Sequence, residues 1–470
     1  MHDHQQTQAA YPPSRDRMDV EEQQHPFFAQ EGVDPLARAF SRKMAVHPGS
    51  GGGHLLTGEA LEKTIAALLQ HRRVKDSAIY VHIPFCESRC LYCGFYRKAY
   101  RNGESKIFTG SLLRELEAWS SHPVARDTPI HAVYFGGGTP SSLEPMDLRV
   151  LLSAVRSNFP LANDCEITVE GRIHNFDADK IKACLDGGAN RFSIGVQTFH
   201  TELRRSMGRI ADRETILRAL QTFKDFNSAV IVIDLIYGFP GQTMEIWQED
   251  IETFLELELD GVDLYQLNVF KDSLLEKKIV RGDFPAAADL PSQSRLFAEG
   301  VRIMEQARYR RLSMSHWGRT TRERNLYNHL MKGPAEALAF GPGAGGYLDN
   351  HFYFIESDYQ QWLDKVARNE KTVAMMMMPA LHADLDKTIT AGFDLGRLNL
   401  EQVKLVSGPA VGPFIEPILH QWGRAGLIRI DGTWLELTLA GQFWHVNLAQ
   451  LLIECLHQSI RMSEQMKNGI

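Results

Sequence analysis

Three cysteines crowded into one short stretch give the strongest chemical signal in the sequence. Cys86, Cys90 and Cys93 follow the spacing C-x3-C-x2-C, and no fourth cysteine lies close to them. Iron–sulfur clusters select thiolate ligands, and a loop of this length can wrap one cubane and ligate three of its irons. The fourth iron then stays open for another ligand. The alternatives are unrelated buried cysteines or a zinc site completed by His82, although the paired cysteines and downstream ligands usual for zinc are missing.

A glycine-rich turn follows the next apolar run. Residues 134–140 read Tyr-Phe-Gly-Gly-Gly-Thr-Pro, so Gly137, Gly138 and Thr139 stand where a strand is expected to end. Glycines in such a place let the backbone approach a ligand closely. The turn is not a phosphate-binding P-loop, because no Lys-Ser/Thr pair follows it. A ligand-binding turn and an ordinary tight turn both fit this segment taken alone.

Polar side chains also interrupt or follow the later apolar runs. Glu170 and Gln197 close two of them, Asp234 lies inside another, and Arg209 comes shortly after Gln197. A carboxylate or amide in an apolar strand is costly unless it has partners. Each of these groups alone fits a satisfied polar residue of the core. Their recurrence on successive runs favours a shared site.

The elements that must position these residues follow a regular rhythm. Short apolar runs, typical of strands, cover residues 78–83, 132–135, 166–170, 191–196, 230–236 and 262–267. Amphipathic segments between them predict helices over residues 106–120, 147–158, 178–185, 213–223 and 244–257. The alternation predicts an α/β fold with a parallel sheet, either open and doubly wound or closed into a partial barrel. In a barrel, functional groups gather at the C-terminal ends of the strands.

The rhythm changes after about residue 290. A helix is expected over residues 413–424, and Asp431-Gly432 between two short apolar runs predicts a hairpin. Together they indicate a small winged-helix-like α+β domain. The predicted organisation is a polar, largely disordered N-terminal extension (1–48), a barrel (75–300), a connecting and substrate-facing segment (301–370), a C-terminal domain (371–445) and a C-terminal helix or tail (446–470).

The composition is that of an ordinary globular chain. Hydrophobic residues make up 44% and charged residues 23% of the sequence, and the formal net charge is -7. Since no long Lys/Arg run is present, we expect no nucleic-acid partner. Neither a membrane-spanning apolar stretch nor an apolar N-terminal signal is visible, so we expect no membrane span and a cytoplasmic location. Clustered thiols in a reducing compartment are more often metal ligands than disulfides.

The cysteine loop after the first predicted strand resembles that of the radical S-adenosylmethionine (SAM) enzymes. The resemblance implies a partial (β/α)6 TIM-like barrel and two cofactors, a [4Fe–4S] cluster and SAM. In this family SAM chelates the open iron through its amino and carboxylate groups. One electron from the cluster then breaks the sulfonium–carbon bond and gives a 5′-deoxyadenosyl radical. The cofactors carry this chemistry, while the protein positions them and excludes water.

Most of the chain, from about residue 75 to 440, resembles the oxygen-independent coproporphyrinogen dehydrogenase (HemN-like) group. The glycine turn is similar to the motif that receives the amino group of SAM. Tyr80 and His82, on the strand that leads into the cysteine loop, are the candidate catalytic residues. By this resemblance the residues that contact SAM are Tyr80, Gly137, Gly138, Thr139, Glu170, Gln197, Arg209 and Asp234.

Softer patterns distinguish the branches of this group. Phe95 stands where the dehydrogenase carries a fourth cysteine, which argues against that activity. Residues 263–270 and 315–328 look most like the haem-utilisation (HutW/ChuW) branch of anaerobic, haem-degrading radical SAM methyltransferases. That resemblance implies a haem or related tetrapyrrole substrate, methylation and opening of the macrocycle to a linear product (anaerobilin), iron release, and an electron donor such as flavodoxin or a reduced flavin. A haem chaperone (HemW-like) and coproporphyrinogen III dehydrogenation are the alternatives.

A basic stretch after the predicted barrel is a candidate contact for the substrate. Guanidinium groups suit carboxylates, so its arginines could pair with haem propionates, and His316 or His329 could meet the iron or a ring edge. A solvated basic surface with ordinary histidines is the alternative. The arginines are Arg308, Arg310, Arg311, Arg319, Arg322 and Arg324.

Overall fold

A curved sheet forms the core of the computed structural model, which describes residues 27–44, 53–407 and 412–467. Its centre is a run of parallel strands that pair with one another in chain order. Their buried, nearly continuous apolar sequences are those of a sheet covered on its outer face. These strands are β2 (Ser77–Ile83), β5 (Ile130–Gly137), β6 (Leu161–Arg172), β7 (Arg191–Gln197), β8 (Val230–Tyr237) and β9 (Gly261–Gln266).

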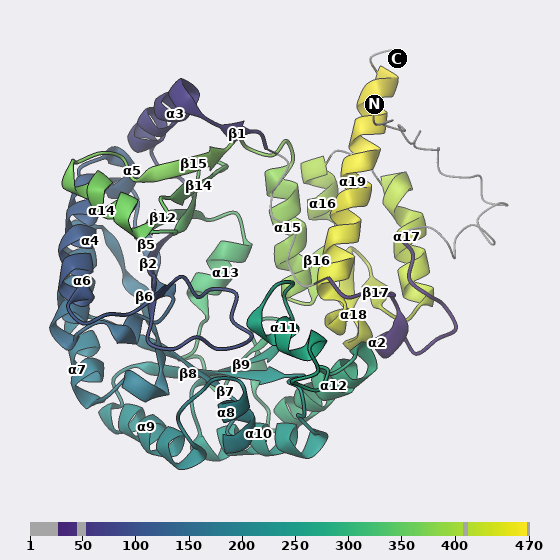
Figure 1. Ribbon diagram of the computed structural model, residues 1–470. Coiled ribbons are helices and arrows are strands. Elements are labelled where there is room, and N and C mark those ends of the chain that lie inside the picture. The colour runs from purple at the N-terminus through teal and green to yellow at the C-terminus, as the bar shows by residue number, and fades with distance from the viewer. Residues whose placement is uncertain (1–26, 45–52, 408–411, 468–470) are drawn as a thin grey trace.

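Helices connect these strands and cover the convex face of the sheet (Figure 1). Local sequence sets their ends: α7 (Ala178–Gly187) begins where the Asp177 side chain accepts a hydrogen bond from the Lys180 backbone, and it ends at Gly188, whose φ is 102°. The predicted βα alternation is therefore confirmed. The other covering helices are α4 (Glu104–Ser120), α6 (Pro145–Asn158), α9 (Arg213–Phe226), α10 (Met244–Leu257) and α12 (Leu290–Gln306).

The sheet continues beyond the predicted strands at both edges. In the described residues it has 13 strands, and β12 (Glu336–Phe340) adds a further parallel neighbour to β2. Segments within residues 301–370, expected as a connection, thus supply several strands. The antiparallel strands beyond β12 are β13 (Gly345–Leu348), β14 (His351–Ile355), β15 (Val373–Met377) and β1 (Leu55–Leu56), and those beyond β9 are β11 (His316–Gly318) and β10 (Arg310–Arg311).

The concave face of the sheet holds one short helix. Helix α13 (Leu326–Lys332) lies inside the arc of strands (Figure 1) and packs against β2 and β5. Leu330 contacts a cluster that includes Ala78 and Ala132, whose small side chains leave room for the helix. The interior of the barrel is therefore partly filled, and the residues that face it are in reach of α13.

A separate group of helices closes the open side of the arc (Figure 1). It contains a small antiparallel sheet in the order β16 (Arg397–Asn399), β18 (Trp434–Leu437), β17 (Ile428–Asp431), with the predicted hairpin turn at Gly432. This confirms the α/β fold class with a C-terminal α+β domain. Its helices are α15 (Ala383–Asp394), α16 (Leu400–Ser407), α17 (Gly412–Arg424), α18 (Leu439–Phe443) and α19 (His445–Lys467).

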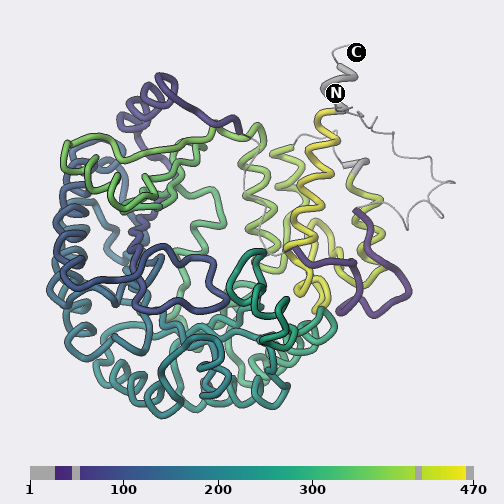
Figure 2. The backbone as a smooth tube through the Cα atoms, in the orientation of Figure 1, coloured from purple at the N-terminus to yellow at the C-terminus, as the bar shows by residue number. Residues whose placement is uncertain are grey.

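The expectation of a largely disordered extension over residues 1–48 is wrong for residues 27–44. This segment, which contains α2 (Pro35–Arg38), runs beside the C-terminal helices (Figure 2). The indole of Trp422 donates to the Phe27 carbonyl at 3.0 Å, and the indole of Trp444 donates to the Pro35 carbonyl at 3.0 Å. Phe27 and Ala39 are buried there. Residues 1–26 and 45–48 of the predicted extension lie outside the described residues.

Candidate active site

The cysteine loop is clipped to the C-terminal edge of the parallel strands. Directly after β2, strand β3 (Phe85–Cys86) pairs with β4 (Lys98–Ala99), so the two ends of the loop lie side by side. In its middle, the Leu91 backbone donates to the Met207 carbonyl at 3.1 Å. Cys86 and Cys90 are each 1% exposed, and Cys93 is half-buried. The pairing of β3 with β4 thus fixes the two ends of the loop, and the thiols of Cys86 and Cys90 are buried.

Two donors reach the sulfur of Cys86. The Thr139 hydroxyl lies 3.3 Å and the Arg172 guanidinium 3.7 Å from it. Burial raises the pKa of the Cys86 thiol, while Thr139 and Arg172 act in the opposite direction and favour the thiolate, the form that ligates iron. Among the described residues no three His, Cys, Asp or Glu side chains close around a point for one metal ion. The thiols of a four-iron cubane are spread more widely than the ligands of a single ion.

The glycine turn presses against the strand that carries the loop. Gly137 has a φ of 108°, and a Cβ there would stand 2.6 Å from the His82 ring. A Cβ on Gly138 would stand 2.5 Å from the Phe85 carbonyl, and its backbone donates to the Ile83 carbonyl at 2.7 Å. Only glycine tolerates both the conformation and the close approach. The turn therefore places bare backbone beside the cysteine loop.

Glu170 lies opposite this turn, on the inner face of β6. Its carboxylate accepts hydrogen bonds from the Tyr134 hydroxyl at 2.6 Å and from the Gly137 backbone at 3.2 Å. Burial raises the pKa of Glu170, and these two donors offset part of that effect. The carboxylate is therefore held in one place beside the glycine turn, with Tyr134 as a partner that the sequence analysis did not single out.

Asp234 and Arg209 approach the same edge from the next strands. Asp234 stands in register with Gly195 of β7 and Asp263 of β9. Burial and the carboxylates of Asp263 and Glu170 raise its pKa, against the opposing charge of Arg209. The Arg209 guanidinium donates to the Gly195 carbonyl at 3.0 Å. A carboxyl and a guanidinium thus face the barrel interior close to the cysteine loop.

Gly195 leaves room for the side chains of Gln197 and Arg209. A Cβ there would stand 2.9 Å from the Gln197 amide nitrogen and 3.3 Å from the Arg209 guanidinium. Gln197 itself has a φ of 74°, which ends β7 and turns its side chain back over the strand. Gly195 was not among the site residues predicted from the sequence, although a glycine inside a strand is a known sign of close approach.

Tyr80 and His82 form a hydrogen-bonded pair on the inner face of β2. The Tyr80 hydroxyl lies 3.0 Å from His82 Nδ1. His82 is 7% exposed, and burial lowers its pKa to about 4, so the ring is neutral. Its Nε2 has no hydrogen-bond partner in the described structure. Tyr327 of α13 stacks on Tyr134 at 4.5 Å and on Tyr80 at 6.3 Å, and the sequence analysis missed it because α13 reaches the site only through the fold.

A second charged cluster extends from Asp263, which is level with Asp234, toward Arg191 at the N-terminal end of β7. Arg191 and Glu323 pair at 3.0 Å, and His316 bridges Asp263 at 2.8 Å and Glu323 at 3.1 Å. Burial alone would lower the pKa of His316, but the two carboxylates outweigh it and raise that pKa to about 9. His316 is thus a buried, paired cation and not a free ligand for iron.

The interpretation of the basic stretch as a set of propionate partners is wrong for three of its arginines. Each pairs with an acid near the N-terminal ends of the strands, at the edge opposite the cysteine loop. These three pairs are Arg319–Glu258 at 2.8 Å, Arg322–Asp260 at 3.6 Å and Arg324–Asp164 at 2.8 Å. Two further arginines of the stretch donate to backbone carbonyls: Arg310 to that of Glu323 and Arg311 to that of Met314.

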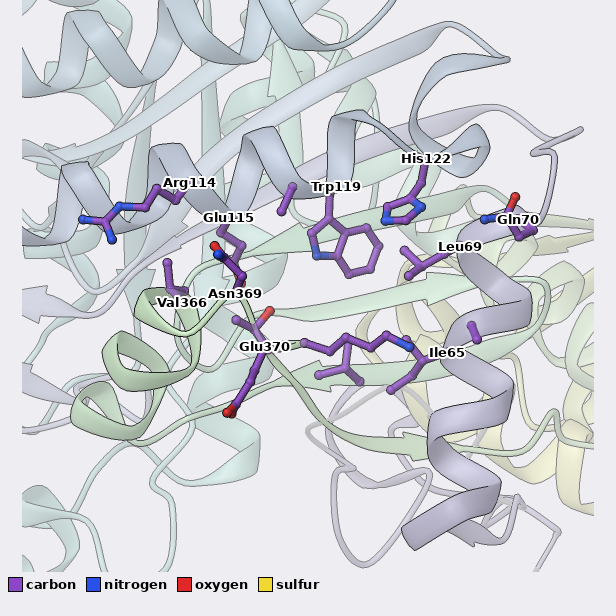
Figure 3. Close-up of a pocket in the computed structure, with 15 residues that line it drawn as sticks. Ile65, Leu69, Gln70, Arg114, Glu115, Trp119, His122, Val366, Asn369 and Glu370 are labelled. Carbon is purple, nitrogen blue, oxygen red and sulfur yellow. The ribbon is translucent and has the colours of Figure 1, made fainter.

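Two cavities of similar size flank the sheet. The inner cavity, of about 340 Å³, lies between β9, α13 and the start of α19, and Asp263 and Tyr265 line it. The outer cavity, also about 340 Å³, lies between α3 (Gly58–Gln70), α4 and α14 (Tyr359–Ala367), with Ile65 and Trp119 in its wall (Figure 3). Its buried acid, Glu115, accepts a hydrogen bond of 2.8 Å from the Gly341 backbone. Of these two cavities, the inner one reaches the charged groups of the barrel interior, through Asp263.

Comparison with known proteins now identifies the family. A model of the radical SAM superfamily matches residues 80–254. The chain is 38% identical to anaerobilin synthase of Escherichia coli O157:H7, over 92% of this chain and 95% of that protein. The chain belongs to the radical SAM superfamily. This radical SAM protein is also 31% identical to the heme chaperone HemW of Lactococcus lactis, over 64% of this chain and 76% of that protein.

The fold agrees with this membership. The structure superposes on that of coproporphyrinogen III oxidase (HemN) from Escherichia coli with a TM-score of 0.71 and 21% identity, covering 84% of this chain and 93% of the other. The prediction that this radical SAM protein belongs to the HemN-like group and is most like its haem-utilisation branch is confirmed. The cofactors of the superfamily, a [4Fe–4S] cluster and SAM, are those of this chain. No helix in the described part of the chain is long and apolar enough to cross a bilayer.

Proposed function

We propose that this radical SAM protein degrades haem by methylating the porphyrin and opening it to a linear tetrapyrrole, with release of iron. The observation that carries the proposal is the 38% identity to anaerobilin synthase, which extends over 92% of this chain. That span includes both the barrel and the C-terminal domain, and so both walls of the inner cavity. The match to the heme chaperone covers only 64% of the chain.

We infer that Cys86, Cys90 and Cys93 hold the cluster. The support is chemical and geometric: the thiols are turned inward by a clipped loop, and donors at 3.3 Å and 3.7 Å favour the thiolate of Cys86. The unpartnered Nε2 of buried His82 and the bare glycine backbone beside it fit a bound group at this edge. Thr139, expected as a SAM contact, directs its hydroxyl to Cys86, so we assign it to the cluster side of the site.

We infer that SAM lies along the remaining residues of the same edge. When bound, the cluster and SAM supply the reductive cleavage of the sulfonium bond and the transferable methyl group. Glu170, fixed by Tyr134 at 2.6 Å, is placed to accept hydrogen bonds from an ammonium group beside the backbone of Gly137. The other residues that we assign to SAM are Gly138, Gln197, Arg209, Asp234 and Tyr80.

Tyr80 and His82 are the residues to which we assign proton handling. The neutral imidazole and the phenol share a hydrogen bond of 3.0 Å, so a proton can be held or passed between the Tyr80 hydroxyl and His82 Nδ1. We place the tetrapyrrole in the inner cavity, because it adjoins Tyr265 and Asp263 and has aromatic walls. We assign the role of electron donor to a reduced flavin or a flavodoxin. We assign the protein to the cytoplasm, because a reducing compartment keeps the thiols that ligate the cluster free of disulfides.

One anaerobic assay tests the proposal. Reconstituted protein, SAM and a low-potential reductant are incubated with either haem or coproporphyrinogen III, and the products are read by mass spectrometry. We expect haem to disappear, with a methylated linear tetrapyrrole and free iron in its place. Haem that is bound but unchanged would instead support a chaperone, and turnover of coproporphyrinogen alone would support oxidative decarboxylation. Either result would overturn the proposal.

A further inference from the structure

The inner cavity carries a cation, Lys43, that has no acidic partner among the described residues. Lys43 extends from the N-terminal segment into the cavity wall, where its ammonium lies 3.4 Å from the centre of the Phe443 ring. It donates a hydrogen bond to the amide oxygen of Gln266, the last residue of β9. Gln266 is itself oriented by a hydrogen bond of 2.7 Å to Gln293 of α12. Lys43 thus reaches the C-terminal edge of the barrel, beside Tyr265.

The backbone on both sides of Lys43 is clamped by one buried side chain. Asn447 of α19 accepts a hydrogen bond from the Met44 backbone at 2.9 Å and donates to the Arg42 carbonyl at 2.9 Å. Fixing a long, flexible lysine side chain costs conformational entropy. The two hydrogen bonds with Asn447 fix the backbone on both sides of Lys43 and so limit where its side chain can reach. The two clamps therefore indicate that the fold presents this ammonium to the cavity.

No carboxylate of the described residues pairs with Lys43. The acids in the cavity wall have other partners: Asp394 pairs with Lys332 at 2.6 Å, and Asp263 pairs with His316 at 2.8 Å. Burial accordingly holds the pKa of Lys43 well below its ordinary value, and no nearby acid offsets that effect. A half-buried ammonium without a counter-charge has lost part of its hydration, and an anionic ligand group would offset that cost.

We propose that Lys43 binds a propionate carboxylate of the tetrapyrrole and thereby fixes the orientation of the macrocycle in the inner cavity. The inference rests on the proposed function and adds the residue that orients its substrate. The cavity supports this arrangement, because Lys43, Phe443 and Tyr265 all line it and the Tyr265 side chain is 38% exposed there. A planar ring held by its carboxylate at Lys43 would be fixed in one orientation beside Tyr265.

The test compares haem with haem dimethyl ester, which lacks the carboxylate charges. Both are titrated anaerobically, by Soret absorbance, into the cluster-reconstituted wild type, K43M and K43R. We expect K43M to weaken haem binding by about 10- to 100-fold, the range of a charge-assisted hydrogen bond, and K43R to restore most of it. The ester should bind wild type as weakly as haem binds K43M, and K43M should not weaken ester binding further.

The matched control is R42M, which removes one charge from the adjacent, exposed residue. We expect it to bind haem like the wild type. Equal losses for haem and ester in K43M would show that Lys43 contributes only structure, and unchanged haem binding in K43M would show that it contributes nothing; either result overturns the inference while leaving the proposed function intact. If the wild type binds neither haem nor its ester, the proposed function fails first and this inference falls with it.

Discussion

The two charged clusters inside the barrel differ in how completely their charges are paired. In the closed cluster, which extends toward the N-terminal end of β7, Arg191, Glu323, His316 and Asp263 satisfy one another at 2.8–3.1 Å. In the open cluster, at the C-terminal ends, Glu170 and Asp234 have raised pKa values and His82 keeps an unpartnered nitrogen. Burial of charge is common to both, so burial alone does not identify a site.

What separates the clusters is the capacity left for a ligand. A closed network stabilises its own geometry and costs much when one partner is removed. An open one is maintained at a cost to folding and is typical of sites that bind or react. The same difference distinguishes the two cavities: similar volumes of about 340 Å³ enclose an unpaired lysine in one and a fully hydrogen-bonded Glu115 in the other.

The largest expected effect comes from removing a ligand at the open end. Cys90→Ala should abolish both the brown cluster chromophore and SAM cleavage, because two thiolates cannot hold the cubane in place. Iron content, the visible spectrum and 5′-deoxyadenosine formation after anaerobic reconstitution measure this. Cys165→Ala, a buried thiol in the first half of β6, is the control and should keep the cluster. A full chromophore in Cys90→Ala would remove the distinction between the two ends.

A substitution in the closed cluster should lower the stability of the protein without changing its cofactor chemistry. Glu323→Gln removes the ion-pair partner of Arg191 and leaves His316 with Asp263 alone, so we expect a loss of about 3–5 kcal/mol in unfolding free energy, the usual cost of breaking a buried pair. Thermal unfolding followed by circular dichroism measures it. Glu258→Gln, which breaks the exposed pair with Arg319, is the control and should change the midpoint little. Equal unfolding midpoints for both variants would contradict the claim that the paired charges of the closed cluster stabilise the fold.

The sequence could predict the barrel because each βα unit is encoded locally. Apolar runs marked every central strand, and the C-terminal ends of parallel strands meet at one edge, so Glu170, Gln197 and Asp234 were brought together without knowledge of distances. The cysteine spacing was likewise local. Arg172 could have been found by the same logic, since it lies two residues after Glu170 and therefore on the same face of β6.

Contacts between distant segments could not be predicted. The Trp422 indole and the Phe27 carbonyl are 395 positions apart, and a polar N-terminal stretch gives no sign that C-terminal indoles will hold it. For the same reason the basic stretch was misread: Arg324 and Asp164 are 160 positions apart, so the sequence showed a cation without its acid. Charge patterns identify ions, but only the fold shows which ions are already paired.

Within the open cluster, loss of one acid should weaken SAM use without harming the fold. For Asp234→Ala we expect SAM affinity to fall by about 10- to 100-fold, the range for a charged hydrogen bond, with an unchanged cluster spectrum and an unchanged or higher midpoint of unfolding. Equilibrium SAM binding and 5′-deoxyadenosine formation provide the readouts. Asp164→Ala, an exposed acid at the opposite edge, is the control and should bind SAM normally. Normal SAM affinity and cleavage in Asp234→Ala would remove Asp234 from the site.

The smallest effect concerns the pH dependence of stability in the cluster-free chain. Asp234 has a raised pKa in the folded state because of burial and the nearby carboxylates of Asp263 and Glu170. The folded chain therefore keeps a proton that the unfolded chain releases near its ordinary pKa of about 4, so wild-type stability should fall, relative to Asp234→Asn, as the pH rises above about 4. The slope is at most about 1.4 kcal/mol per pH unit, until the raised pKa is passed. Unfolding midpoints of both proteins across this range measure the difference. A wild type that instead gains stability over Asp234→Asn with rising pH would mean that Asp234 is paired like the acids of the closed cluster, and the contrast between the two ends of the barrel would be lost.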